Sequence, residues 1–102
     1  MSNYIVIYYG DPKFSSPEDA KQNQARWQAW AANLGDALIN QGTPLGMPKT
    51  VSSSGVADET RPERMTGFSM VKADSLEAAI EMVKDCPYLE YGTIDVAEAF
   101  TM

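Results

Sequence analysis

The chain contains no histidine, and this absence limits the chemistry that it can perform. A Ser–His or Cys–His nucleophile pair within the chain is excluded, as are zinc and iron sites that use histidine ligands. A general base must therefore be an aspartate, glutamate, tyrosine, lysine or cysteine. Cys86 is the only cysteine, and Lys84 is its only basic neighbour in the sequence. Because a reactive thiol needs an activating environment, we predict a structural role for Cys86.

Two aspartates are candidates for acid–base catalysis. If Ile94 and Val96 pack into the core, Asp95 points to the other face of its strand, where a partly dry interface would let it act as an acid or base. Lys72 is expected on the same face, so the more ordinary alternative is an exposed Asp95 or an Asp95–Lys72 pair. Asp11 ends the first strand and can line the mouth of a site, although Asp-Pro is more often a simple turn.

Aromatic residues supply the first candidates for ligand binding. Trp27 and Trp30 are neighbours on a predicted helix, where they can wall an aromatic pocket, although such a pair more often forms plain core packing. We expect Tyr88 and Tyr91 either to lie at the rim of a pocket or to cover the edge of the sheet.

Two arginines supply the second kind of candidate. Arg61 and Arg64 lie in a polar loop of an acidic chain, where they can grip a carboxylate or phosphate. The alternative is a solvated loop whose arginines pair with neighbouring acidic residues. The complete set of candidate ligand-binding residues is Trp27, Trp30, Arg61, Arg64, Phe68, Lys72 and Tyr91.

Four segments that must position these residues have the composition of strands. Runs of β-branched and aromatic residues predict strands over 4–9 and 65–73, and an alternating pattern predicts a last strand over 92–100. The serine-rich segment 50–54 follows Pro48, so we predict an edge strand there.

Two helices are predicted between the strands. Ser16 can cap the first helix, and an apolar stripe at spacings of three and four residues continues across Gly35 to a stop at Gly42. We therefore predict one long helix. The second helix is predicted to begin at Asp74 as its cap and to stop before Pro87.

The order strand, helix, strand, strand, helix, strand predicts a single α+β domain over residues 1–102 with a ferredoxin-like β-α-β-β-α-β fold and an antiparallel sheet. Both helices then cover one face. The first strand is apolar on both sides, so whichever side is bare would add two tyrosine or isoleucine positions to Phe68 and Met70 in a large apolar patch on the other face. We therefore predict a homodimer whose two sheets pack face to face. The alternative is a monomer in which strand-forming residues simply face solvent.

Composition disfavours several kinds of partner. The net charge of -6 repels nucleic acid, and no basic cluster is present to bind an anionic membrane. A lone cysteine cannot form an internal disulfide, and the N-terminus lacks the features of a signal peptide. We expect a cytoplasmic protein with no metal site and no cofactor.

Three stretches, 4–11, 67–79 and 86–96, carry a family resemblance. They contain a Tyr-Gly-Asp strand ending, a Gly-aromatic strand followed by Asp-Ser-Leu, and a Cys-Pro turn before the last strand. In this order they resemble the YCII-related family of dimeric α/β-barrel proteins. The resemblance implies a fold and a dimer rather than a reaction. Many relatives carry Asp-Gly-Pro-Phe before the third strand, and here only Asp58 corresponds.

Two functions follow from these observations. The first is a non-catalytic module that binds a small molecule or a protein, and the absence of histidine favours it. The alternative is a small cofactor-free enzyme, isomerase- or lyase-like, that uses carboxylate or tyrosine acid–base chemistry.

Overall fold

The computed structural model describes residues 1–10, 16–58 and 63–100 of the chain. No helix in these ranges is both long and apolar enough to cross a membrane. In chain order the elements are the strand β1 (Ser2–Gly10), the helix α1 (Pro17–Leu34), the 3₁₀ turn η1 (Gly35–Ala37), the strands β2 (Leu38–Pro44), β3 (Lys49–Ser52), β4 (Gly55–Asp58) and β5 (Met65–Ala73), the helix α2 (Leu76–Val83), the 3₁₀ turn η2 (Pro87–Glu90) and the strand β6 (Gly92–Ala99).

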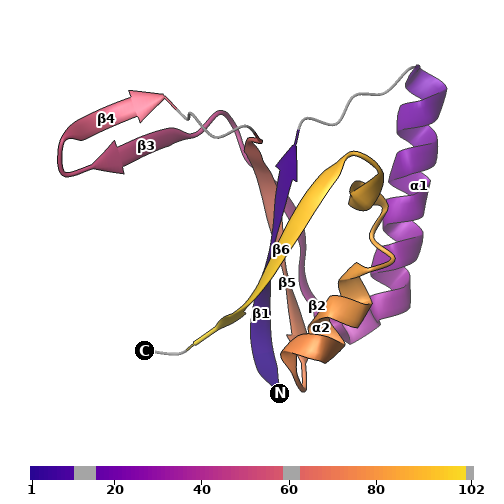
Figure 1. Cartoon of the computed structure of the whole chain (residues 1–102). Helices are drawn as coiled ribbons and strands as arrows, with labels where there is room; N and C mark the ends of the chain where they lie inside the picture. The colour runs from indigo at the N-terminus through magenta and orange to yellow at the C-terminus, as the bar shows by residue number, and fades with distance from the viewer. Residues whose placement is uncertain (11–15, 59–62, 101–102) are drawn as a thin grey trace.

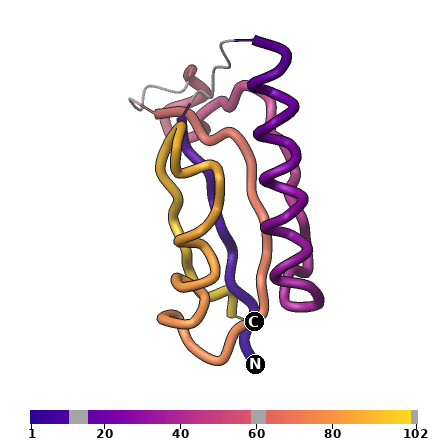
Figure 2. The backbone as a smooth tube through the Cα atoms, turned by 90° about the vertical axis from the view of Figure 1, so that its right-hand side faces the viewer, coloured from indigo at the N-terminus to yellow at the C-terminus, as the bar shows by residue number. Residues whose placement is uncertain are grey.

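The main sheet has the strand order β2-β5-β1-β6, and all of its pairs are antiparallel. Both helices lie on one face of this sheet (Figure 1). Viewed from that side, α1 runs along one half of the sheet and α2 covers the other (Figure 2). The predicted α+β ferredoxin-like fold is confirmed, with β1 and β5 in the centre.

The core lies between the helices and the sheet. The alternation along β1 buries Tyr4, Val6 and Tyr8 on the helix side, where they meet Val71 of β5 and Trp30 of α1. The intervening residues of β1 point to the opposite face, which no helix covers (Figure 1). We call this second surface the open face; its apolar residues are Ile5, Ile7, Tyr9, Phe68 and Met70.

The first helix is shorter than the sequence predicts. It ends at Leu34, because Gly35 adopts a φ of 56° and its N–H donates to the carbonyl of Ala31. Such a positive φ is readily available to glycine and closes the helix. The prediction that the helix continues to Gly42 is wrong. It failed because Leu38 is buried as the first residue of β2, so the apolar stripe continues after the helix has ended.

The predicted edge strand over 50–54 is also wrong. The edge strand beside β5 is β2, while residues 49–58 form the separate hairpin β3–β4. The hairpin projects from the body of the molecule on the side of the open face (Figure 1). Every residue of its two strands is exposed. We call this hairpin the arm.

The second helix matches its predicted position but uses a different cap. The Oγ of Ser75, rather than Asp74, accepts a hydrogen bond from the backbone N–H of Ala78 at 3.1 Å. Such a cap satisfies one of the free N–H groups of the first turn. The helix buries Ala79 and Val83 against the sheet.

Candidate functional site

A cavity of about 620 Å³ opens between α1 and one end of the sheet. We call it the α1 cleft. Within the described residues its lining contains no aspartate, glutamate, lysine or arginine, so it is an uncharged pocket with aromatic walls and a few amide and hydroxyl groups. The lining consists of Tyr8, Asn23, Gln24, Trp27, Gln41, Gly42, Thr43, Pro44, Thr66, Gly67, Tyr88 and Tyr91.

One wall of the cleft is the irregular end of β2. Pairing between β2 and β5 shifts register on both sides of Asn40, whose Oδ1 accepts a hydrogen bond from the N–H of Gly42 at 2.9 Å. This local turn gives the strand its bulged course. A Cβ at Gly67 would lie 2.9 Å from the carbonyl oxygen of Thr43, so only glycine permits this approach of β5 to β2.

The inner wall is a group of aromatic rings in contact with one another. The rings of Tyr8 and Trp27 are 5.5 Å apart and nearly perpendicular, at 78°, and those of Tyr8 and Tyr88 are 5.1 Å apart. Trp27 also meets Trp30 edge to face at 5.3 Å. Trp30 is anchored in the core because its Nε1 donates to the carbonyl of Met82 at 2.9 Å. Trp27 therefore forms one side of the cleft, and Trp30 supports the ring of Trp27 from the core.

The tyrosine hydroxyls are bonded within the protein. Tyr8 shares a buried hydrogen bond of 2.7 Å with Ser69, whose side chain is fully buried. Thr66 donates to the carbonyl of Tyr8 at 3.3 Å, so in the 2.7 Å contact between Thr66 and Tyr88 the proton comes from Tyr88. Burial raises the pKa of Tyr8 far above its usual value. Tyr8 therefore stays protonated at neutral pH and is not a general base.

Asn23 is a residue of the cleft that the sequence analysis missed. It is 6% exposed, and its Nδ2 has no hydrogen-bond partner among the described residues. Its position carries a signal in the sequence, because Ala20, Asn23, Trp27 and Trp30 follow one another at helical spacings of three, four and three. A polar residue on the apolar stripe of a helix must be buried.

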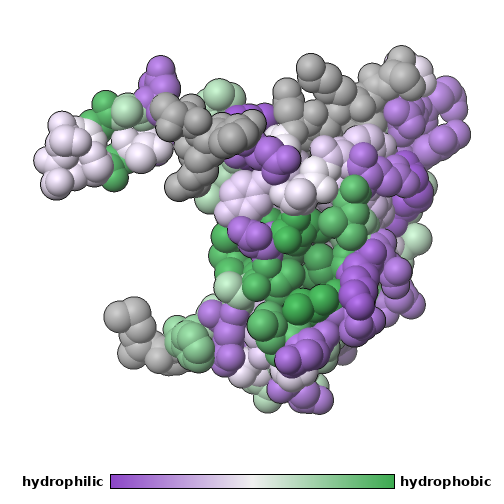
Figure 3. Space-filling view, viewed as in Figure 1, coloured by the Kyte–Doolittle hydropathy of each residue, from purple (hydrophilic) through white to green (hydrophobic). Residues whose placement is uncertain are grey.

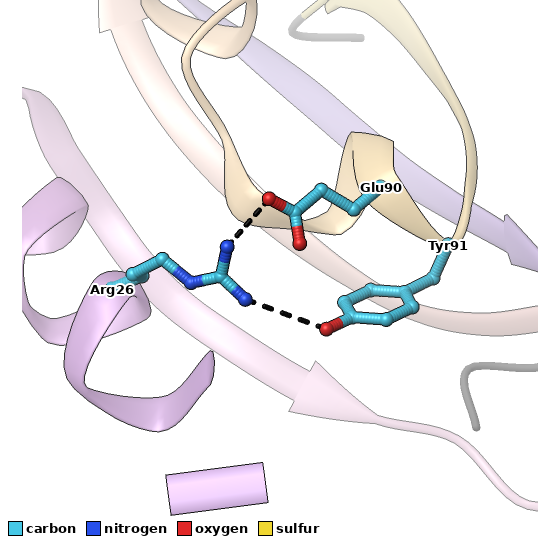
Figure 4. Close-up of polar contacts among 3 residues, drawn as sticks. All are labelled: Arg26, Glu90 and Tyr91. Atoms are coloured by element: carbon cyan, nitrogen blue, oxygen red, sulfur yellow. Dashed lines mark hydrogen bonds and ion pairs between the residues drawn. The ribbon is translucent and has the colours of Figure 1, made fainter. Parts of the chain in front are cut away.

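An ion pair lies next to Tyr91, one of the residues that line the cleft. Arg26 of α1 donates to the Oε1 of Glu90 in η2 at 2.5 Å and, more weakly, to the hydroxyl of Tyr91 at 3.5 Å (Figure 4). The hydrogen bond to Glu90 raises the pKa of Arg26. All three side chains thus join the helix to the segment that carries two rings of the cleft.

Cys86 lies next to η2 and is 3% exposed. Burial raises the pKa of its thiol to about 11. A thiol with this pKa is protonated at neutral pH and is a poor nucleophile. This geometry agrees with a structural role.

The raised pKa predicts a pH dependence of stability. Between 9.0, the ordinary pKa of the thiol, and about 11, its pKa in the fold, the native state keeps a proton that the unfolded chain has lost. The free energy of unfolding should therefore fall as pH rises through this window. Urea unfolding at successive pH values should show a smaller fall in Cys86→Ala than in the natural chain. Some fall should remain in the variant, because the pKa of Tyr8 is raised as well. Equal falls in both proteins would contradict the prediction.

The structure places three of the sequence candidates away from the cleft. Phe68, Lys72 and Asp95 face the opposite side of the sheet. In register Asp95 lies opposite Ile7, whereas Lys72 lies opposite Asn3, four residues further along β1. Both charged side chains are exposed, and no ion pair joins them. The structure therefore does not bring them together.

The remaining candidates lie near the start of β5 or outside the described residues. Arg64 is half-buried, and its carbonyl accepts a hydrogen bond from the N–H of Gly10 at 2.8 Å. Asp11 and Arg61 lie outside the described residues. Of the ligand-binding candidates, the structure brings Trp27 and Tyr91 into the α1 cleft. Within residues 1–10, 16–58 and 63–100, no three Cys, Asp or Glu side chains cluster as metal ligands would.

The fold belongs to a known class of domain. The model of the YCII-related domain family matches residues 3–102, so the chain belongs to this family, and the resemblance inferred from its three stretches is confirmed.

A solved structure of the same kind is 5-chloro-2-hydroxyhydroquinone dehydrochlorinase (TftG) from Burkholderia phenoliruptrix AC1100, in complex with 2,5-dihydroxybenzoquinone. Our chain is similar to it with a TM-score of 0.60 at 16% identity, over 96% of this chain and 93% of that one. At this identity the likeness establishes a shared fold. No curated protein matches the sequence.

Proposed function

We propose that this protein is a homodimeric module that binds a small organic molecule in the α1 cleft. The observation that carries the proposal is an open cleft, uncharged over its described lining, beside a buried amide nitrogen of Asn23 that has no hydrogen-bond partner among the described residues. Ligand sites are concave and mostly apolar, with a few convergent polar groups, and the α1 cleft has this character. The dehydrochlorinase that shares the fold is in complex with a small ring compound, which supports a ligand of that size.

The alternative is a cofactor-free enzyme. It is supported by the structural neighbour, which is a dehydrochlorinase. Acid–base catalysis needs a group that can take a proton near neutral pH. Tyr8 does not meet this need, since burial raises its pKa, and the described lining offers no carboxylate. Of the two aspartates that the sequence offers for catalysis, Asp95 faces the opposite side of the sheet and Asp11 lies outside the described residues. The described residues favour binding.

The proposed dimer would form on the open face. Figure 3 shows hydrophobic surface over the middle of the molecule, reaching from the recess between the arm and the C-terminal end of the described chain across β6 toward α2. Contiguous apolar surface of this kind often marks an interface. A second copy lying on the open face would also meet the arm, which is exposed along both of its strands. An isolated two-stranded hairpin is only marginally stable in water, so a partner surface would stabilise it.

Two further expectations accompany this proposal. We place the protein in the cytoplasm, because its only cysteine is free and buried and gives no sign of an oxidising compartment. We also treat residues 1–102 as one functional unit.

The test of the binding site is a thermal-shift screen against neutral aromatic compounds and small organic acids. A ligand at a hundred times its Kd should stabilise the protein by about 2.7 kcal/mol. Trp27→Ala removes one wall of the cleft and should weaken binding of the hit at least tenfold. Gln28→Ala, at an exposed neighbouring position of α1, should leave the affinity unchanged. Equal affinity in both variants, or no hit at all, would count against the cleft.

A further inference from the structure

Asn23 contains a buried hydrogen-bond donor for which the described residues supply no acceptor. It comes from the buried stripe of α1 and lines the cleft, with Nδ2 unpartnered among the described residues. A buried donor without a partner costs free energy relative to one in water. An apolar residue of similar size would avoid that cost. The amide therefore lowers the stability of the protein without ligand, and a ligand that accepts its hydrogen bond would remove that cost.

The hydroxyl groups beside the aromatic wall of the cleft are already bonded within the protein. The hydroxyl protons of Thr66 and Tyr88 bond within the protein, and Tyr8 pairs with Ser69. What the described lining lacks is an acceptor for Asn23. A ligand that completes this network must bring an oxygen or nitrogen with a lone pair.

The walls of the cleft define the rest of the ligand. Trp27, Tyr88 and Tyr8 present the faces and edges of rings, which favour a planar partner. The described lining carries no charge, and Arg26, which donates to Tyr91 of that lining, is paired with Glu90. Placing a charged group among these side chains would leave it unpaired, and that is unfavourable.

We propose that the α1 cleft is selective for a neutral, planar ring compound bearing a carbonyl or ether oxygen, to which Asn23 donates a hydrogen bond. This rests on the proposed binding function and adds the chemical class of the ligand. It assigns Asn23 as the residue that determines specificity.

Three matched probes test the proposal: acetophenone, ethylbenzene and benzoate. They share one ring and differ in bearing a neutral acceptor, no acceptor or a negative charge. In NMR titrations of the natural protein, acetophenone should bind roughly tenfold more tightly than ethylbenzene, since one hydrogen bond distinguishes them. It should also shift the side-chain amide signals of Asn23, identified by their loss in Asn23→Leu. Benzoate should bind least tightly.

The variants separate recognition from structure. Asn23→Leu should abolish the preference for acetophenone over ethylbenzene, and without ligand it should melt at or above the natural temperature. Asn33→Leu, at an exposed position of the same helix outside the cleft, should keep the preference. If Asn23→Leu does not fold, the amide is structural and the proposal is overturned; Asn23→Ala, which removes the amide without adding bulk or charge, checks that result.

The failures are distinguishable. Binding of all three probes with equal affinity, or tightest binding of benzoate, would overturn the selectivity and leave the cleft as a binding site. No perturbation of any cleft signal by any probe would overturn the proposed function as well.

Discussion

Gly92→Ala is expected to destabilise the protein by at least about 3 kcal/mol, at the upper end of the cost of forcing extra atoms into a packed interior. A Cβ at Gly92 would lie 2.0 Å from the carbonyl oxygen of Tyr9 and 2.9 Å from Cε2 of Tyr88. The first contact is with backbone, so β1 and β6 would have to separate where Gly10 faces Gly92. Because single domains are stable by only about 5–15 kcal/mol, a loss of this size threatens the whole fold.

The measurement is the free energy of unfolding in urea, followed by circular dichroism. Gly46→Ala is the matched control, since a Cβ at Gly46 would meet nothing within 4 Å. That control should change stability by less than about 1 kcal/mol. A Gly92→Ala protein as stable as the control would mean that β6 does not approach β1 this closely. The clash with Tyr88 also predicts that ligand binding in the α1 cleft suffers before unfolding is complete.

Ile7→Asp is expected to dissociate the proposed dimer, with a rise of at least about a hundredfold in its dissociation constant, because a buried unpaired charge costs several kcal/mol. In register Ile7 lies between Phe68 of β5 and Asp95 of β6, near the middle of the open face. The new carboxylate would face apolar surface of the second copy and lie beside an existing negative charge. Ile7 points away from the helices, so the monomer should still fold.

Sedimentation or light scattering of the natural protein and the variant at micromolar concentration provides the readout. Leu89→Asp is the control, because Leu89 is 45% exposed and lies on η2, away from the open face. It should leave the dimer intact. A natural protein that is monomeric at these concentrations would refute the dimer. A dimer lost in Leu89→Asp but kept in Ile7→Asp would move the interface to another surface.

The central strands were predictable because the type of each residue reflects the side of the sheet on which it lies. The run from Tyr4 to Tyr9 is apolar throughout, and the alternation of Phe68 and Met70 with Ser69 assigns both faces of β5 correctly. β2 was not predictable in this way. Its sequence contains Asn40, a glycine and a proline, and its pairing is interrupted by bulges, so no period of two appears. Without a strand there, the serine-rich arm was the only remaining candidate for an edge.

The candidate site was predictable only in part for the same reason. Trp27 and Tyr91 are conspicuous as large aromatic residues, and both line the cleft. One wall of the cleft is β2. Because the sequence analysis predicted no strand over these residues, it could not predict the cleft. Asp95 and Lys72 were correctly placed on one face by alternation, but alternation carries no information about register, and the pairing of strands separates them by four positions. Distance along a sheet is a tertiary property.

The arm enters and leaves the sheet at neighbouring points, because the N–H of Leu45 donates to the carbonyl of Thr66 at 2.9 Å, just beyond the ends of the β2–β5 pairing. The pairing of β2 with β5 is thus complete up to the points where the arm begins and ends. The arm is therefore an insertion between two strands that pair without it. Its length and sequence can change without altering the pairing of β2 with β5. Variation in such a segment would change the surface beside the open face while the sheet, the helices and the cleft keep their geometry.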